Sequence, residues 1–222
     1  MTEAQYPADE VQPAQPSQGT EEQSLEVRVK AMLEGTQPFD REAIRDYVLR
    51  TEQERETYRK LSERDPLTGA YNRRKFEHDL EATAHKADRI HFDFSLIYID
   101  LDFLKQINDG PGNHADGDTA LRTVTGVAHK MLRDYDSDHL YRIGGDEFAI
   151  ILEGTDLSQG VAIAERLKQA INEAKLSVSM GVSNYKGVAD STIGLVQSAD
   201  RALYKAKEQG RNKVVAAEPL LD

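Results

Sequence analysis

Runs of apolar residues separated by polar, turn-forming stretches give the chain from Asp65 onward the texture of a folded domain. Strands are predicted at the β-prone runs 94–99, 140–143, 149–152, 176–182 and 213–215. Helices are predicted where apolar residues recur every three to four positions, at about 73–86, 116–132, 157–174 and 192–208. Strands that alternate with helices around one antiparallel hairpin predict an α/β fold, with a sheet that is covered by helices.

The N-terminal part of the chain has a different texture. Residues 1–24 contain no lysine or arginine and five acids, a composition that predicts a disordered acidic tail. Residues 25–64 predict a helical segment: a short helix that stops at Gly35, then a long helix with Asp40 as its N-cap. A polar run interrupts the apolar positions of the long helix, which makes it a poor coiled coil. Two interpretations therefore remain: a signalling stalk, or a solvated helix that packs loosely on its own domain. Residues 217–222 predict a short C-terminal tail.

The most informative motif lies in the predicted hairpin and reads Gly144-Gly145-Asp146-Glu147-Phe148. The glycine pair between two β-prone runs predicts a two-residue turn. A turn does not require an acidic pair directly behind its glycines. Bare glycine backbone lets phosphates come close, and carboxylates hold a hard cation, so the motif suits a triphosphate with its metal ion.

A second acidic pair, Asp100 and Asp102, follows the strand predicted at 94–99. Magnesium prefers oxygen ligands and usually keeps substrate phosphates in its coordination shell. Asp100, the Leu101 carbonyl and Asp146 would form such a site if the strand and the hairpin were neighbours. The alternative is that these acids simply make the ends of strands soluble.

Several polar side chains suit a nucleotide, although each also has an ordinary structural explanation. Lys105 suits a phosphate and Asn108 suits a base or ribose, but both are also common surface residues. Asp118 could be a stabilising acid at the N-terminus of a helix. Equally, its carboxylate could accept hydrogen bonds from the ring N–H and the exocyclic amine of guanine together. Lys207 and Arg211 suit either the C-terminus of the last helix or a clamp on terminal phosphates.

Composition narrows the class of protein. The net charge of −11 disfavours nonspecific binding to nucleic acid, so a polyanionic ligand would need a few local cations and a metal. The absence of cysteine excludes disulfides and thiolate metal sites. No apolar run is long enough for membrane insertion, and the N-terminus lacks a secretory signal pattern. We therefore expect a soluble, cytoplasmic protein.

Four separated blocks of the chain share the order and spacing of one family. They are Asp65-Pro66-Leu67-Thr68-Gly69 with Asn72-Arg73-Arg74, Asp100-Leu101-Asp102 with Lys105 and Asn108-Asp109, the Gly144 hairpin, and Ala199-Asp200-Arg201-Ala202-Leu203-Tyr204-Lys205-Ala206-Lys207 with Gly210-Arg211-Asn212. On these blocks, residues 65–215 resemble a complete GGDEF domain, the domain of diguanylate cyclases. We therefore expect the domain to occupy residues 65–216.

The resemblance implies both a fold and a reaction. The fold is an α+β palm-like nucleotidyl-cyclase domain, whose central and mainly antiparallel sheet is covered by helices. Two GTP-loaded domains meet face to face as a homodimer, with Mg²⁺ or Mn²⁺ as cofactor. The 3′-hydroxyl of each GTP attacks the α-phosphate of the other, which gives cyclic di-GMP and two pyrophosphates. The product is a second messenger of bacterial signalling.

The resemblance also assigns roles to residues. The metal ligands are Asp100, the Leu101 carbonyl and Asp146. The substrate-binding residues are Asn108, His114, Asp118, Gly144, Gly145, Lys207 and Arg211, of which Asn108 and Asp118 read guanine. The catalytic residues are Asp146, Glu147 and Lys105. The general base stays open between Asp146 and Glu147, while Lys105 steadies charge in the transition state.

The chain departs from the family pattern in two places. One extra residue lies between Asn108 and Asp118, within a loop of glycine and turn formers that can absorb it. The inhibitory product site of many members needs an arginine where this chain has Tyr135, although the aspartate of that site is kept as Asp138. We therefore expect no strong product inhibition through this site.

Three functions remain to be compared. The first is an active diguanylate cyclase, because every chemically essential position holds the expected residue type. The second is a catalytically silent module that binds GTP or a cyclic dinucleotide and acts through protein partners. The third is a cyclase with relaxed base choice, which Asp118 disfavours because a carboxylate prefers guanine to adenine. A regulatory protein that acts through the tail or stalk is a further expected partner.

Overall fold

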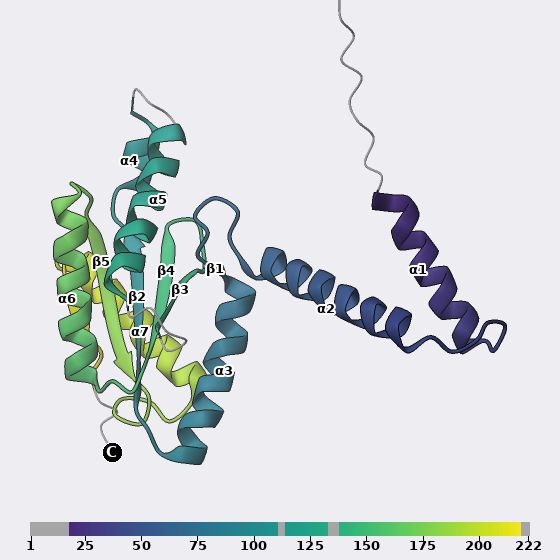
Figure 1. Ribbon diagram of the computed structural model, residues 1–222. Coiled ribbons are helices and arrows are strands. Elements are labelled where there is room, and N and C mark those ends of the chain that lie inside the picture. Colours follow the sequence, from purple (N-terminus) through teal and green to yellow (C-terminus); the bar gives the residue numbers. More distant parts are fainter. Residues whose placement is uncertain (1–17, 111–113, 133–137, 219–222) are drawn as a thin grey trace, which may run out of the picture. The chain divides into compact units, whose positions relative to one another are not determined.

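The computed structural model describes residues 18–110, 114–132 and 138–218 (Figure 1). The chain divides into two compact units, Met1–Leu61 and Ser62–Asp222.

The first unit is helical. It contains α1 (Gln18–Leu33) and most of α2 (Arg41–Glu63). The predicted cap of the long helix is confirmed, because the carboxylate of Asp40 accepts hydrogen bonds from the backbone N–H groups of Glu42 and Ala43. Helix α1 begins at Gln18, within the stretch whose composition predicts a tail, and no described helix is long and apolar enough to cross a membrane.

The second unit is built on one six-stranded sheet with the order β1-β3-β4-β2-β5-β6. The strands are β1 (Tyr71–Asn72), β2 (Phe94–Leu101), β3 (Asp138–Arg142), β4 (Glu147–Glu153), β5 (Val178–Asn184) and β6 (Val214–Ala216). Each adjacent pair among the four central strands is antiparallel, whereas the edge strands β1 and β6 run parallel to β3 and β5. The predicted fold, a mainly antiparallel sheet covered by helices, is therefore confirmed.

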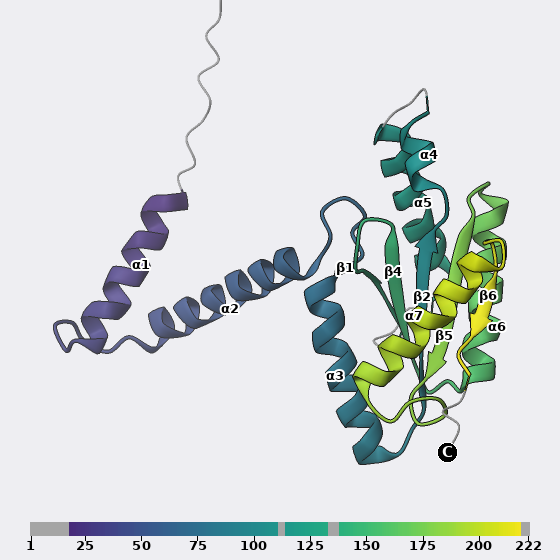
Figure 2. The ribbon, with the colours of Figure 1, turned by 180° about the vertical axis from the view of Figure 1, so that it is seen from behind.

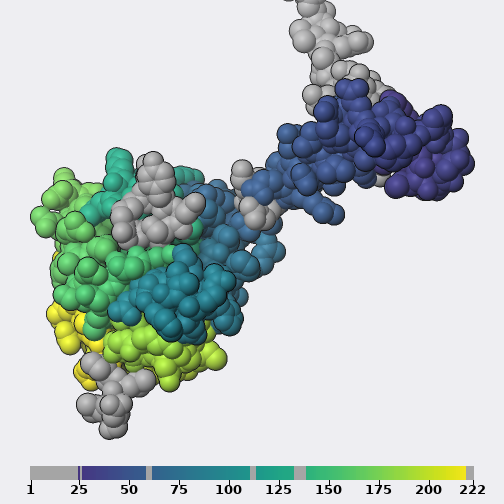
Figure 3. Space-filling model, turned by 60° about the horizontal axis from the view of Figure 1, so that its bottom comes forward, coloured from purple at the N-terminus to yellow at the C-terminus, as the bar shows by residue number. Residues whose placement is uncertain are grey.

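Helices cover both faces of this sheet (Figures 1 and 2). They are α3 (Arg73–Ile90), α5 (His114–Met131), α6 (Leu157–Glu173) and α7 (Thr192–Glu208). The short helix α4 (Leu104–Asn108) packs against α5. Side chains alternate between the faces of a strand, so Ile97 and Ile99 join the core under α5 and α6, while Leu96 joins the core under α3 and α7. Figure 3 shows α3, in blue, against the beginning of α7, in yellow-green, where the Thr192 hydroxyl donates to Glu81 at 2.5 Å.

A polar network ties α3 to the sheet. The Asp79 side chain is only 15% exposed, lies 3.0 Å from Nζ of Lys75 and accepts a 2.9 Å hydrogen bond from the Tyr141 hydroxyl. Burial alone would raise the pKa of Asp79, but hydrogen bonds from His78, Lys75 and Tyr141 outweigh it and hold this pKa below its usual value. Ionised Asp79 therefore stabilises the fold.

Replacement of Asp79 by asparagine is expected to lower the free energy of unfolding by about 2 kcal/mol at pH 7. The pKa of Asp79 is lower in the folded state than in the unfolded state, so its stabilisation is present above the unfolded value of 3.8. That stabilisation is lost as the pH falls through the folded value, and the difference between Asp79→Asn and wild type should shrink below about pH 4. Urea unfolding from pH 7 to pH 2 measures this, with the exposed Asp93→Asn as control. A difference that stays constant across this range would contradict it.

Candidate active site

The acids singled out in the sequence meet at the end of β2. Strand β2 lies beside β4, which places Asp100 directly opposite Glu147 in the antiparallel ladder. The backbone N–H of Leu101 donates a 3.0 Å hydrogen bond to the carbonyl of Asp146. The strand end and the hairpin are therefore neighbours, as the proposed metal site requires.

The hairpin turn is one residue longer than the predicted two. The last registered pair is Arg142 with Phe148, and the N–H of Ile143 donates to the Glu147 carbonyl at 2.9 Å. The turn therefore includes Asp146 as well as the two glycines, because Asp146 pairs with β2 instead of continuing β4.

The two glycines of the turn have different surroundings. Neither has a positive φ, so the turn does not need glycine for a left-handed backbone. A Cβ at Gly144 would overlap the carboxylate of Glu147, which folds back against the turn. A Cβ at Gly145 would meet nothing within 4 Å, so the exposed backbone at Gly145 is open to a large polar group. Close approach, and not conformational freedom, is what these glycines allow.

A lysine from the far end of the chain completes this acidic edge. Nζ of Lys207, in the last turn of α7, lies 2.6 Å from a carboxylate oxygen of Asp100. Burial raises the pKa of Asp100, and the carboxylates of Asp146 and Asp102 raise it further, although Lys207 opposes the shift. The edge therefore has more negative charge than Lys207 alone neutralises, which favours an additional cation.

The donor set fits a magnesium or manganese ion that shares its ligands with a substrate. Asp100 and Asp146 provide carboxylates, and Leu101, the residue after Asp100 whose N–H bonds to the Asp146 carbonyl, can add its backbone carbonyl. Among the residues that the structure describes, no three acidic or histidine side chains form a closed metal cluster. A hard cation held here would complete its coordination shell with oxygens from elsewhere, which is the usual arrangement for magnesium with nucleotide phosphates.

The predicted base-reading residues come together at α4 and α5. The stretch predicted as a turn is the short helix α4, which carries Lys105 and Asn108. A Cβ at Gly117, the residue before Asp118, would overlap the side-chain oxygen of Asn108. Asn108 therefore lies directly against the first turn of α5. His114 begins this helix and is exposed. The extra loop residue therefore leaves Asn108 and the start of α5 in contact.

The structure locates the expected phosphate-binding Arg211, but it does not test the expected loss of the inhibitory product site. Arg211 lies beside the same edge, with its Nε 3.9 Å from Asp102 and its guanidinium carbon 5.4 Å from the centre of the Phe103 ring. Tyr135 lies outside the described residues, and Asp138 is the first residue of β3. The expectation about product inhibition therefore stays a prediction.

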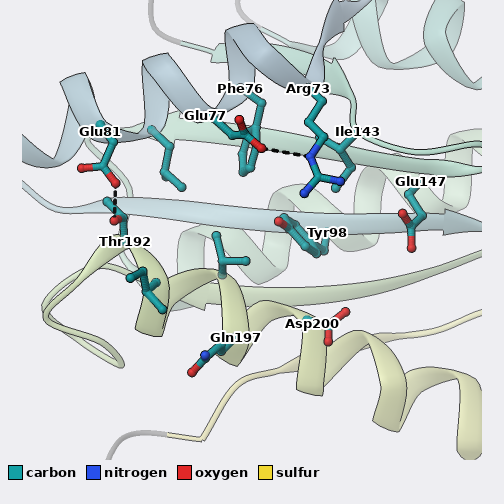
Figure 4. A pocket seen from close by; sticks show the side chains of 13 residues that line it. Arg73, Phe76, Glu77, Glu81, Tyr98, Ile143, Glu147, Thr192, Gln197 and Asp200 are labelled. Carbon is teal, nitrogen blue, oxygen red and sulfur yellow. Dashed lines mark hydrogen bonds and ion pairs between the residues drawn. The ribbon is translucent and has the colours of Figure 1, made fainter.

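A pocket of about 520 Å³ adjoins the hairpin between α3 and α7 (Figure 4). Glu147 reaches into it from β4, while Arg73 lies across from Asp200 and donates to Glu77 at 2.9 Å. Burial, with the nearby carboxylate of Asp200, raises the pKa of Tyr98 to about 12, so its hydroxyl stays protonated. Of these pocket residues, sequence reasoning gave a role to Glu147 alone. Arg73 and Asp200 stand in the matched blocks, which was the signal available for them.

The comparisons with known proteins decide the family. The family model described as "Diguanylate cyclase, GGDEF domain" matches residues 62–213, well over half of the chain. This chain belongs to the GGDEF family. The match begins at the first residue of the second structural unit and ends directly before the last strand.

Curated relatives agree with this membership. The uncharacterized protein YhcK of Bacillus subtilis is 39% identical over 165 residues, which are 69% of this chain and 45% of the relative. Diguanylate cyclase A of Treponema denticola is 36% identical over 133 residues, which are 56% of this chain and 35% of the relative. The chain thus spans less than half the length of these relatives.

Solved structures of GGDEF proteins share the fold. The coiled coil and GGDEF domain of DgcB from Caulobacter crescentus, in complex with c-di-GMP, superposes with a TM-score of 0.70 and 26% identity, covering 87% of this chain and all of that one. The diguanylate cyclase SiaD from Pseudomonas aeruginosa, in complex with its activator SiaC, gives a TM-score of 0.67 and 29% identity. That match covers 90% of this chain and 78% of SiaD.

Proposed function

We propose that this GGDEF protein is an active diguanylate cyclase that works in the cytoplasm. It condenses two GTP molecules into cyclic di-GMP and releases two pyrophosphates. The observation that carries the proposal is the meeting of Asp100, Asp146 and Lys207 at one edge of the sheet. Two carboxylates and one cation beside open glycine backbone are what a metal-bound triphosphate needs.

Metal binding is assigned to Asp100, the Leu101 carbonyl and Asp146. Mg²⁺ or Mn²⁺ held there would neutralise phosphate charge and make a hydroxyl easier to deprotonate. The surroundings of Asp100 support the assignment, because burial and the neighbouring carboxylates of Asp146 and Asp102 raise its pKa, and a bound cation would offset that repulsion. Gly144 and Gly145 are assigned to the phosphates, and the open space around Gly145 leaves them room beside the metal ligands.

Substrate binding is assigned to residues at the end of α7 and to residues on α4 and α5. Lys207 and Arg211 hold the terminal phosphates, and Arg211 can make bidentate contacts. Asn108 and Asp118 read guanine, which their adjacent helices support. His114 is the remaining substrate contact in this assignment.

The chemical step is an in-line transfer at phosphorus. The 3′-hydroxyl of one GTP attacks the α-phosphorus of the other, its proton goes to Asp146 or Glu147, and pyrophosphate leaves with the electron pair of the broken P–O bond. Lys105 stabilises the charge that develops on the transferred group. Because each nucleotide is both nucleophile and electrophile, two domains must face each other as a homodimer.

Purified protein incubated with GTP and magnesium is expected to give cyclic di-GMP, with a specific activity that falls on dilution. The fall follows because an active site shared between two copies is lost when the dimer dissociates. Chromatography of the products over a hundredfold range of protein concentration measures both. Binding of GTP with no product at any concentration would contradict the proposal and favour the silent module, and ATP supplied with GTP tests for mixed dinucleotides.

A regulatory protein partner is proposed for the N-terminal region. The supporting observation is that the similar cyclase SiaD forms a complex with its activator SiaC. The first helical unit of this chain also exposes large apolar side chains, among them Val48 and Tyr58, that a protein surface could cover.

A further inference from the structure

The end of helix α7 has a geometry that the proposed function does not explain. The N–H of Gly210 donates to the Lys207 carbonyl at 3.3 Å, and the N–H of Arg211 donates to the Ala206 carbonyl at 3.0 Å. This pair of hydrogen bonds is a Schellman motif, in which Gly210 takes the left-handed position with a φ of 103°. The motif terminates the helix and brings Arg211 directly after it.

The left-handed backbone continues beyond the glycine. Arg211 has a φ of 62° and Asn212 has a φ of 50°, so two residues with side chains follow Gly210 in this region. Such a conformation is unfavourable for residues other than glycine, and it persists only where surrounding groups hold it. Helix α7 satisfies the N–H of Arg211, but the N–H of Asn212 needs another acceptor.

That acceptor is the carboxylate of Asp102. The Asp102 side chain is fully buried, and its oxygens accept from the Asn212 N–H at 3.2 Å, the Ser177 hydroxyl at 2.7 Å and the Ser179 hydroxyl at 2.8 Å. Nε of Arg211 lies 3.9 Å from the same carboxylate. A buried charge held by three donors and a guanidinium is rigid, because each donor fixes its orientation.

The residue after Asp102 supports the same guanidinium from another side. Phe103 also has a left-handed backbone, with a φ of 64°, and its ring lies 5.4 Å from the guanidinium carbon of Arg211. A bulky residue in this region is a genuine outlier and points to a local constraint. Asp102 and Phe103 together thus fix where the guanidinium of Arg211 lies, beside the end of the strand that carries Asp100.

We propose that Asp102 is a positioning residue for Arg211. Its buried carboxylate holds the left-handed turn that presents this guanidinium to the phosphates of a nucleoside triphosphate. The inference rests on the proposed function, in which Arg211 binds the terminal phosphates of GTP. Asp102 does not act as a metal ligand here, because hydroxyl, backbone and guanidinium donors occupy its oxygens. Asp100, in contrast, accepts a side-chain hydrogen bond from Lys207 alone among the described residues.

Asp102→Asn keeps the shape of the side chain but removes the charge, and it is expected to weaken triphosphate binding about tenfold. The probe is a GTP analogue with an α,β-methylene bridge, titrated by calorimetry in the presence of magnesium. The exposed Asp190→Asn removes the same unit of charge away from the turn and should bind the analogue like wild type. Ser179→Ala removes one donor to Asp102 and should weaken binding by a smaller factor.

A double-mutant cycle separates positioning from general stability. In an Arg211→Ala background, Asp102→Asn should change the affinity by less than about twofold, because the group that it positions is gone. Hydrogen exchange of residues 209–213 should be faster in Asp102→Asn than in wild type. Exchange that is unchanged in this segment, or an effect on affinity that stays about tenfold without Arg211, would overturn the inference.

The same measurements distinguish this inference from the proposed function. Wild-type protein that binds the analogue but makes no cyclic di-GMP contradicts the cyclase activity, and the binding and exchange tests of Asp102 still apply. If Asp102→Asn does not fold, Ser177→Ala and Ser179→Ala carry the test, since each leaves the carboxylate in place. Wild-type protein that does not bind the analogue would overturn both.

Discussion

Alanine at position 146 is expected to lower the rate of cyclic di-GMP formation by about a thousandfold while the fold stays intact. Asp146 lies in the hairpin turn, and only its backbone carbonyl is used by the sheet, through the N–H of Leu101. Alanine keeps that carbonyl and removes the carboxylate that we assign to the metal. The loss should therefore appear in kcat far more than in the free energy of unfolding, which should change by only about 0.5 kcal/mol.

The measurement compares product formation and urea unfolding of Asp146→Ala with those of wild type. Asp190→Ala is the matched control, because it removes an exposed carboxylate that no proposed contact uses. A variant that keeps more than a tenth of wild-type turnover would contradict the assignment of Asp146. A variant that unfolds would show instead that the carboxylate is structural.

The second large effect concerns stability. Gly181→Ala is expected to lower the free energy of unfolding by about 3 kcal/mol or more. Gly181 lies in β5 where α7 crosses the sheet, and a Cβ there would overlap the carbonyl oxygen of Ala199 and the backbone nitrogen of Leu203. Backbone atoms in a helix cannot move away as a flexible side chain can, so α7 must shift as a whole.

Gly126→Ala provides the opposite control. Gly126 lies inside α5, and a Cβ there would meet nothing within 4 Å. Alanine is the better helix former by about 1 kcal/mol, so this variant should be more stable than wild type. Urea unfolding of both variants checks the pair, and equal effects of the two substitutions would contradict the close packing of α7 on β5. A shift of α7 would also move Lys207 from Asp100, so GTP binding should weaken in Gly181→Ala.

Local sequence patterns were sufficient for most helices and strands. Helix α7 has the predicted bounds of 192 and 208, and Asp40 caps α2 as expected, because periodicity and capping are local signals. Two elements were missed. Strand β1 is only two residues long and exists through its pairing with β3, and α4 is a five-residue helix in a stretch rich in turn formers.

Long-range contacts explain what the sequence could not predict about the site. The two-residue turn was wrong because Asp146 bonds to Leu101 on a strand far away in the chain, a pairing that no local pattern shows. Lys207 lies 107 positions from Asp100, and only the packing of α7 on the sheet brings them together. Only the family resemblance assigned Lys207 and Asp100 to the same site in advance. The partners of Asp102 include two serines, which carry no chemical signal in a sequence.

The short outer strands have a consequence for behaviour at high concentration. Strand β1 has two residues and β6 has three, so the margins of the sheet expose few unpaired backbone groups to another chain. Long open margins recruit strands from other copies and lead to aggregation. A protein whose activity is proposed to require a second copy must tolerate crowded encounters. The brevity of its outer strands favours association through side chains over uncontrolled growth of the sheet from copy to copy.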